Sequence, residues 1–214
     1  MKKIYLTSLL TLALILLIIF IKANTISVID TTIGKGLYTL HDQPLVSFIK
    51  WVGMLGSTVG IVTVLFVSML LFIIFQRNVK AAVILFLSVL IGNVGNKLLK
   101  ALIGRERPTF PEHIEDGFSF PSGHVMVGLL LFGMIAYYLV RVSQTIKVKQ
   151  TILICTSLLL MIIGFSRLLE GEHFLTDVIG GFITGGLVLM GMISIDQVLH
   201  TKIERRKGKN DVAL

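Results

Sequence analysis

The amino-acid sequence predicts an all-α polytopic membrane protein in which six transmembrane helices form one bundle. Two features of composition lead to this fold class. Hydrophobic residues make up 54% of the 214 residues, and the mean hydropathy is +0.89. Charged residues are only 15%, whereas a soluble domain needs roughly a quarter to cover its core with a wetted shell. The apolar residues also come in long runs, so lipid must face most of the surface.

Six apolar runs are long enough, or nearly long enough, to cross about 30 Å of hydrocarbon as helices. The first run follows Lys2 and Lys3 as a signal peptide would, but its length and its poor cleavage pattern favour a retained helix. Proline and glycine separate several of the runs, and we expect one domain over residues 1–214. The expected helices cover residues 4–21, 52–75, 81–103, 122–140, 151–166 and 173–195.

Polar residues inside the runs are expected to face the interior of the bundle. The third run contains Asn93, Asn96, Lys97 and Lys100, which share one face of a helix. Polar groups at membrane depth avoid lipid, so this face should point inward. The single cysteine, Cys155, lies in an apolar run and is expected to be a small buried hydrophobic residue.

The distribution of basic residues predicts the orientation. Twelve of the twenty Lys and Arg residues lie near the termini or in the second and fourth connections, at 1–3, 76–80, 141–150 and 196–214. Cytoplasmic segments of membrane proteins are enriched in such residues. We therefore expect a multi-pass cell-membrane protein with both termini in the cytoplasm and the other connections outside.

Residues with chemical function gather near the ends of the predicted helices. One group follows the third helix, one opens the fourth, and one lies between the fifth and the sixth. Because successive helices alternate in direction, all three groups reach the outer membrane face. Each residue alone has a structural explanation, such as snorkelling or helix capping. The groups hold three cations, two histidines, a hydroxyl and a carboxylate: Lys100, Arg107, Arg167, His124, His173, Ser122 and Asp177.

Together these side chains supply what phosphoryl transfer needs. The transferred group spreads negative charge over three oxygens, and catalysis is mostly positioning and electrostatic stabilisation. Arg107 and Arg167 offer planar forks that match phosphate oxygens, and Lys100 adds a compact charge. The backbone N–H groups after Pro121, at a helix N-terminus, form an anion site, and the Ser122 hydroxyl adds a donor.

The two histidines suit complementary roles. Neutral His173 can attack phosphorus if an acceptor holds its other nitrogen, and Asp177 lies one helical turn further on. His124 can protonate the leaving oxygen and later accept a proton from the hydrolytic water. Because His173 must start neutral and His124 protonated, we expect a bell-shaped dependence of the rate on pH.

Eleven residues resemble, in order and spacing, the three-part signature of the type 2 phosphatidic acid phosphatase superfamily. They are Lys100 with Arg107 and Pro108, the run 121–124, and Ser166 with Arg167, His173 and Asp177. The family also has six membrane helices, so the resemblance covers nearly the whole chain. It implies His173 as nucleophile, His124 as general acid and Asp177 as partner of the nucleophile, with no metal or other cofactor. It also implies a phosphate site made of Lys100, Arg107, Ser122, Gly123 and Arg167.

The resemblance implies a membrane lipid phosphatase that acts through a phosphohistidine on a lipid phosphate ester or diphosphate. Small members of this kind resemble undecaprenyl-diphosphate phosphatases and phosphatidylglycerophosphate phosphatases. Undecaprenyl diphosphate is favoured, because the chain carries no large extra domain. Phosphatidylglycerophosphate or phosphatidic acid is the alternative substrate, and a non-catalytic lipid-binding or scaffold protein is the alternative of another class.

Several residues and partners fall outside this signature. Arg105 and Lys97 match no signature position, so headgroup contact or a place in the bundle interior is expected for them rather than catalysis. The segment 25–50 is either a plain connector or an interfacial guide for a lipid tail. The expected partners are a lipid phosphate and the membrane. No basic stripe with interleaved aromatics indicates nucleic acid, and the oligomeric state is left open.

Overall fold

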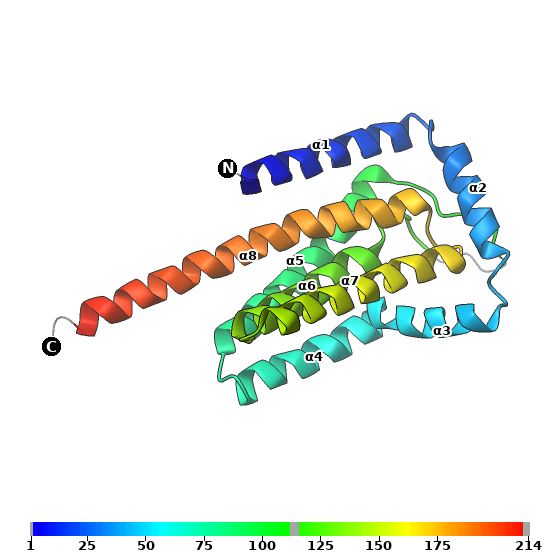
Figure 1. The fold of residues 1–214 in the computed structure, drawn as a ribbon. Helices are drawn as coiled ribbons and strands as arrows, with labels where there is room; N and C mark the ends of the chain where they lie inside the picture. The colour runs from blue at the N-terminus through cyan, green and yellow to red at the C-terminus, as the bar shows by residue number, and fades with distance from the viewer. Residues whose placement is uncertain (1, 112–115, 212–214) are drawn as a thin grey trace.

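The computed structural model describes residues 2–111 and 116–211, which are mostly helical and include no strand (Figure 1). Five of the helices are long and apolar enough to cross a membrane, and a bent pair supplies a sixth crossing if it is counted as one span. The predicted all-α membrane fold is therefore confirmed. The elements are α1 (Lys2–Lys22), α2 (Ser27–Tyr38), α3 (Pro44–Gly53), the short 3₁₀ helix η1 (Met54–Gly56), α4 (Thr58–Ile74), α5 (Val79–Ile103), α6 (Gly123–Val142), α7 (Ile146–Leu169) and α8 (Leu175–Asp211).

The predicted second span begins in a different place. Residues 52–56 belong to α3 and η1, and a bend of 59° separates Pro44–Gly56 from α4. The bend falls where the Ser57 hydroxyl accepts a hydrogen bond from the backbone N–H of Gly60 and so starts a new helix. Gly53 lies so close to α7 that a Cβ there would approach the Ser166 hydroxyl to 2.2 Å. A continuous straight helix would lose this contact.

Two short helices replace the expected loop over residues 25–50. Pro44 takes the first position of α3, where its fixed φ suits a helix start. In α2, Asp30 and Gly34 are buried against the rest of the molecule. Both helices are too short to cross a membrane, which is why a search for long apolar runs does not find them. They lie together at one end of the bundle (Figure 1).

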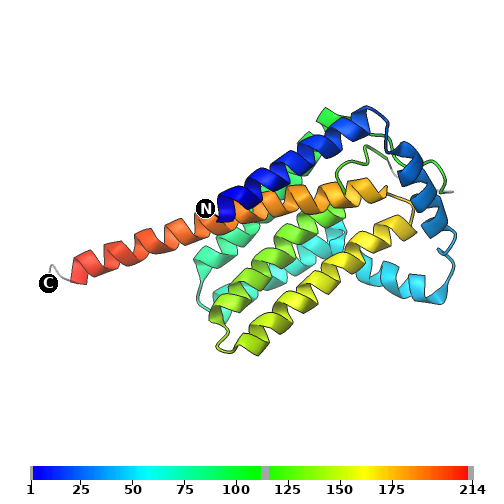
Figure 2. The ribbon, with the colours of Figure 1, turned by 45° about the horizontal axis from the view of Figure 1, so that its top comes forward.

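The core of the bundle lies around α6, which packs against α5, α7 and α8. Leu85, Leu131 and Met134 are fully buried there. By contrast, α1 packs mainly along α8 on the outside of the bundle, as the turned view shows (Figure 2). Most of the side chains on α1 are exposed, as expected for a helix surrounded by lipid.

Close packing of α6 and α8 brings the beginnings of these helices together. A Cβ at Gly181 or Gly185 would lie 2.9 Å from the carbonyl oxygens of Ser122 and Met126, respectively. Small residues allow membrane helices to approach this closely. Accordingly, the backbone N–H of Ser122 donates to the carbonyl of Asp177 at 3.0 Å. The residues before α6 and those in the first turn of α8 therefore share one site.

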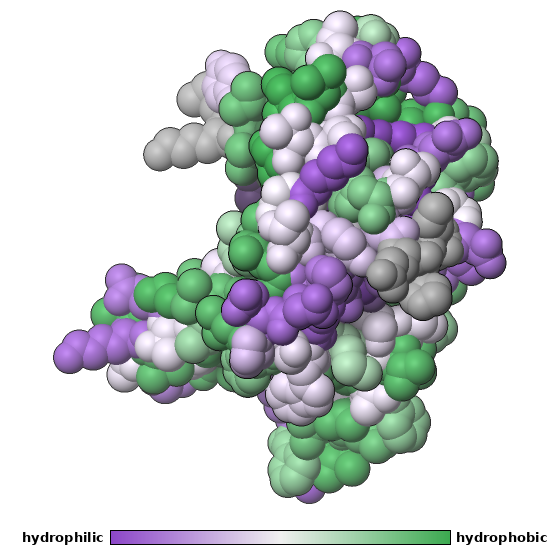
Figure 3. Space-filling view, turned by 90° about the vertical axis from the view of Figure 1, so that its right-hand side faces the viewer, coloured by the Kyte–Doolittle hydropathy of each residue, from purple (hydrophilic) through white to green (hydrophobic). Residues whose placement is uncertain are grey.

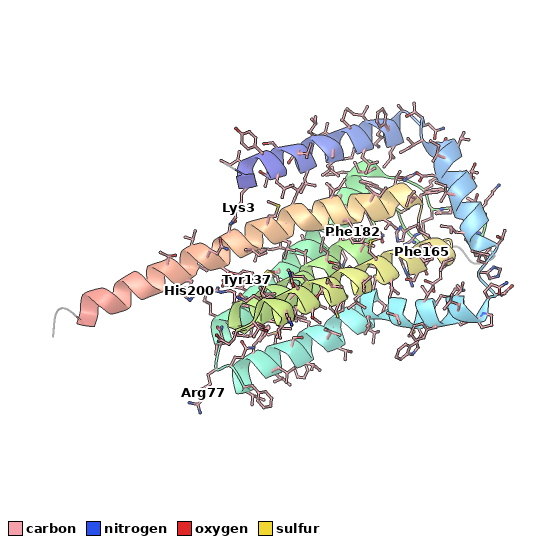
Figure 4. All side chains as sticks on the ribbon, in the orientation of Figure 1. Lys3, Arg77, Tyr137, Phe165, Phe182 and His200 are labelled. Carbon is pink, nitrogen blue, oxygen red and sulfur yellow. The ribbon has the colours of Figure 1, made fainter. Side chains whose placement is uncertain are left out.

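At the other end of the bundle, an ion cluster around Asp196 joins α5, α6 and α8. Asp196 is buried and accepts from Lys80 and Arg141 as well as from two tyrosine hydroxyls. Tyr137, one of the two, lies in the half of the bundle toward the chain ends, whereas Phe165 and Phe182 lie toward the opposite end (Figure 4). The start of α1 and the last turns of α8 lie away from α2 and α3 (Figure 1).

The expectation that Cys155 is buried is wrong, because Cys155 is exposed on α7. Lys97 is exposed on α5, so it does not point into the bundle interior, and headgroup contact is the expected position that is left for it. In lipid, small apolar side chains face outward at no cost, and a lysine close to a helix end extends its ammonium to the headgroups. His113 and the basic side chains of 202–209 lie outside the described part of the structure.

Candidate active site

A cavity of about 340 Å³ opens among α4, α5 and α6 at the end of the bundle that carries α2 and α3. Viewed from this end, hydrophilic side chains gather across the middle of the surface, between hydrophobic ones (Figure 3). The inner polar wall of the cavity contains five of the predicted site residues, namely Lys100, Arg107, Gly123, His124 and His173. The structure thus brings together residues that are up to 73 positions apart in the chain, from Lys100 to His173.

The end of α5 directs two cations to this wall. Lys100 lies in the last turn of α5, and Gly104 ends the helix in the left-handed region, with a φ of 64°. This turn sends the following residues back across the end of the bundle. One terminal nitrogen of Arg107 then donates to the carbonyl of Glu172 at 2.9 Å. The connection after α5 is thereby tied to the residues that precede His173.

His173 lies just before α8 and only 2% of its side chain is exposed. Its Nδ1 is 3.6 Å from Oδ2 of Asp177, which is too long for a hydrogen bond. The same Oδ2 accepts from the backbone N–H of Phe174 at 2.8 Å and so caps α8. Burial lowers the pKa of His173 below its ordinary value; Asp177 opposes this shift, and Arg107 and Lys100 add to it. These influences favour the neutral imidazole that a nucleophile requires.

His124 occupies the first turn of α6, next to the Arg167 guanidinium. Its Nε2 lies 3.2 Å from one terminal nitrogen of Arg167. The same nitrogen donates to Glu172 at 2.7 Å, and the other terminal nitrogen is paired with Glu170. The Arg167 side chain is 5% exposed and lies between an imidazole and two carboxylates. Arg167 does not line the cavity itself but contacts His124, which does.

Ser122 and Gly123 form the start of α6. Ser122 is fully buried, and its hydroxyl has no hydrogen-bond partner among the described residues. A Cβ at Gly123 would lie 3.1 Å from the side-chain oxygen of Asn96, so any larger residue would require Asn96 to shift. Asn96 also donates to the carbonyl of Pro121 at 3.0 Å, which holds the segment before α6 against α5.

Sequence reasoning missed a buried network behind Asp177. Arg105, for which no role in the site was expected, forms ion pairs with Asp177 at 2.7 Å and with Asp30 at 2.6 Å. Its side chain is 12% exposed, which places it in the bundle interior, one of the two positions expected for it. Asp30 comes from α2, in a segment where no helix was expected. Its acidic side chain amid apolar neighbours was the only signal in the sequence.

The arrangement can bind an anion and present two imidazoles to it. Lys100, Arg107 and the N-terminus of α6 line the inner end of the cavity. Arg167 lies behind this lining, next to His124, and the Ser122 hydroxyl is buried beside Gly123. Within the ranges described, no three His, Cys, Asp or Glu side chains come together in a way that could hold a metal ion. The expectation that the chemistry needs no metal stays a prediction.

Fold and site together define an integral-membrane protein with a cavity at one end of its helix bundle, lined by two histidines and two cationic side chains. The chain belongs to the PAP2 superfamily, whose family model matches residues 81–200. The match extends from α5 into α8 and includes every predicted site residue. It confirms the resemblance to the type 2 phosphatidic acid phosphatases.

Named relatives agree with this assignment. The chain is 39% identical to phosphatidylglycerophosphatase B of Bacillus subtilis (strain 168) over 116 residues. These aligned residues cover 53% of this chain and 55% of the relative. The aligned part thus spans about half the length of that relative. The crystal structure of a transmembrane PAP2-type phosphatidylglycerolphosphate phosphatase from Bacillus subtilis has a TM-score of 0.81 and 29% identity, covering 89% of this chain and 96% of that one.

A more distant structure shares the fold alone. The crystal structure of Aquifex aeolicus LpxE has a TM-score of 0.55 at 23% identity and covers 78% of this chain and 95% of that chain. The helix bundle therefore recurs in a protein whose sequence differs widely from this one.

Proposed function

We propose that this protein is a membrane lipid phosphatase that transfers the terminal phosphate of its substrate to His173. One observation carries the proposal: the cavity that holds His173 and His124 at its inner end has apolar walls beyond them. A phosphate can lie at the polar end while an acyl or prenyl chain follows the walls. Membership of the PAP2 superfamily supports the same class of reaction.

The apolar part of the cavity suits a lipid tail. Between Lys100 and Phe86 the cavity follows α5 for roughly 20 Å, at about 1.5 Å of rise per residue. Its opposite wall on α4 includes Val62 and Leu65. Val62 and Phe86 are also exposed on the outer surface, so the cavity opens toward lipid between α4 and α5. A water-soluble ester would have no use for such a passage.

In the first step, Nε2 of His173 attacks phosphorus, because Nδ1 faces Asp177. The bond between phosphorus and the lipid oxygen breaks, and this oxygen takes a proton from His124. Lys100, Arg107 and Arg167 balance the negative charge on the phosphoryl oxygens. In the second step, water gives a proton to His124 and attacks phosphorus. The phosphorus–nitrogen bond then breaks, and inorganic phosphate leaves.

Phosphatidylglycerophosphate is the first candidate substrate, because the named relative and the similar crystal structure, both from Bacillus subtilis, carry phosphatidylglycerophosphate phosphatase names. Undecaprenyl diphosphate, favoured from the sequence, is the second. Both present a terminal phosphate at the headgroup level and an apolar chain, which the cavity can take between α4 and α5. They differ in the group that bears the phosphate, a glycerol ester in one and a diphosphate in the other.

The direct test is phosphate release by the protein purified in detergent, with a chelator present. The substrates are phosphatidylglycerophosphate, undecaprenyl diphosphate, phosphatidic acid and the tail-free glycerol phosphate. We expect release from at least one lipid, little from glycerol phosphate, and none from His173→Ala. Equal release from glycerol phosphate would contradict the role of the apolar walls, and undiminished release by His173→Ala would overturn the proposal.

A further inference from the structure

The carboxylate beside the nucleophile is held by a buried ion network that includes a helix outside the matched family region. Asp177 is fully buried and forms an ion pair with Arg105 through Oδ1 at 2.7 Å. The other terminal nitrogen of Arg105 forms an ion pair with Asp30 at 2.6 Å, and Asp30 is 1% exposed. One guanidinium thus bridges two buried carboxylates.

Further hydrogen bonds fix each member of the network. Arg105 also donates to the Thr176 hydroxyl at 2.7 Å. The backbone N–H of Thr176 donates to Oδ1 of Asp30 at 3.2 Å, and its hydroxyl donates to Oδ2 of Asp30. The Arg105 guanidinium lies over the ring of Phe174, 4.4 Å from its centroid. With the capping bond from Phe174 to Asp177, every polar atom of the two carboxylates has a partner.

The network joins three separate parts of the chain. Asp30 belongs to α2, Arg105 to the connection after α5, and Asp177 to the first turn of α8. The family model matches only residues 81–200, so Asp30 lies outside it. In this protein, α2 supplies a buried charge directly behind the site and is more than a connector.

We propose that Asp30 and Arg105 are positioning residues for the reaction at His173, acting through Asp177. This inference rests on the proposed function, in which His173 gains positive charge as it attacks phosphorus. Arg105 fixes the direction of the Asp177 carboxylate toward Nδ1. Asp30 offsets the charge of Arg105, so that Asp177 keeps its full attraction for the developing imidazolium.

The balance of charge makes this proposal specific. The two carboxylates and the guanidinium sum to one negative charge. Without Asp30 the sum is zero, and without Arg105 it is two negative charges. Changing both residues restores one negative charge but removes the bridge. The other titratable or charged groups that face His173 do not change in these variants; they are Lys100 of α5, Arg107 of the following connection, His124 of α6, Arg167 of α7 and the adjacent Glu172.

The test compares Asp30→Asn, Arg105→Met, the double variant and the conservative Asp30→Glu in the full-length protein. The first readout is the pH dependence of kcat and kcat/KM for lipid phosphate hydrolysis. The second needs no substrate: diethyl pyrocarbonate reacts only with neutral imidazole, so its rate at His173, followed by peptide mass spectrometry, reports the protonation of that residue. Melting temperature in detergent reports folding of each variant.

We expect Asp30→Asn to lower kcat about tenfold with KM within about twofold. The acidic limb of the pH dependence of kcat/KM should move to lower pH by on the order of half a unit in this variant, because less negative charge near His173 favours the neutral imidazole. Arg105→Met should move the limb to higher pH, the double variant should return it close to the wild-type position, and Asp30→Glu should restore most of kcat. The modification rate of His173 should follow the same order.

Outcomes that overturn the inference are distinct from failure of the proposed function. If Asp30→Asn only lowers the melting temperature, and neither the pH limb nor the modification of His173 moves, Asp30 is structural and the inference is wrong. If Asp30→Asn does not fold, Arg105→Met and Asp30→Glu carry the same comparison. If the wild type hydrolyses no lipid phosphate, the proposed function fails. The order of the diethyl pyrocarbonate rates at His173 among the variants still tests whether Asp30 and Arg105 influence the protonation of His173.

Discussion

The side chain of Arg167 contacts two carboxylates and the imidazole of His124. Glu172 accepts from it at 2.7 Å, Glu170 is paired with it, and His124 lies 3.2 Å away. Under the proposed function, the phosphate of a substrate uses the same planar fork. Binding therefore has to weaken at least one of these carboxylate contacts, which gives Glu172 an influence on affinity.

Glu172→Gln should accordingly strengthen substrate binding. The neutral amide competes less for Arg167, so KM should fall roughly threefold while kcat changes little. Michaelis constants with a lipid phosphate and inhibition constants with inorganic phosphate provide the measurement. Asp42→Asn is the matched control, since the Asp42 side chain is 89% exposed and pairs with His41 away from the cavity. A higher KM in Glu172→Gln would show that Glu172 supports binding instead.

The protonation of His173 leads to a prediction about pH. Burial and nearby cations lower its pKa from the ordinary 6.5, despite the opposing effect of Asp177. Protonation removes the lone pair of the nucleophile, so activity falls as pH drops through the pKa of His173. The acidic limb of kcat/KM, which reports the free enzyme, should have its midpoint below pH 6.5. A midpoint above that value would mean that Asp177 outweighs burial.

At the residue scale, the sequence identified the groups that share a signature spacing. Lys100, Arg107, His124 and His173 meet at one cavity, because that spacing puts them at neighbouring helix ends. Asp30 could not be found in this way. Its partner Arg105 lies 75 positions further along the chain, and an acidic side chain near apolar ones is too weak a local signal to show that the carboxylate becomes buried in the folded bundle.

At the scale of elements, the long apolar runs predicted the position of five helices, because membrane thickness sets the length of a spanning helix. The expected end of the last one, at residue 195, is wrong, because α8 continues to Asp211. The bend before α4 and the short helices α2 and α3 could not be predicted from run length. They depend on tertiary contacts, such as the approach of Gly53 to Ser166. These elements nevertheless shape the site, since a Cβ at Gly56 would lie 3.3 Å from the ring of His124.

Blocking the apolar wall between α4 and α5 should impair lipid hydrolysis selectively. Leu65 lines the cavity and is 9% exposed, so Leu65→Trp would fill the space expected to take the lipid tail. We expect at least a tenfold loss of kcat/KM for the lipid, on the order of 1.4 kcal/mol. Diethyl pyrocarbonate modification of His173 should continue if the headgroup end stays open.

The matched control uses the same substitution on the outer face of the same helix. Leu70 is 40% exposed on α4 and does not line the cavity. Leu70→Trp should retain lipid hydrolysis and detergent solubility. Equal loss in both variants would indicate damage to α4 rather than a blocked passage, and equal activity in both would place the tail elsewhere.

At the scale of the whole molecule, the chain ends lie away from α2 and α3, at the end opposite the cavity (Figure 1). The distribution of Lys and Arg predicts that these ends face the cytoplasm. Taken together, the two observations put the cavity at the outer face of the membrane. This orientation is a proposal that cysteine labelling can test.

In a Cys155→Ser background, Asp116→Cys on the cavity side should react with an impermeant thiol reagent on intact cells. Gln144→Cys, in the connection between α6 and α7, should react only after lysis. Both positions are exposed in the structure, so accessibility within the protein does not limit either reaction. The reverse pattern would invert the proposed orientation and move the site to the cytoplasmic face.

The central claim is that phosphate passes through a covalent bond to His173. The most direct measurement is rapid quenching, under alkaline conditions, of the protein mixed with lipid phosphate labelled on its terminal phosphorus. We predict label on the peptide that contains His173, formed and lost at least as fast as turnover, and no label in His173→Ala. Steady turnover without label on that peptide, or label that persists in His173→Ala, would contradict the mechanism.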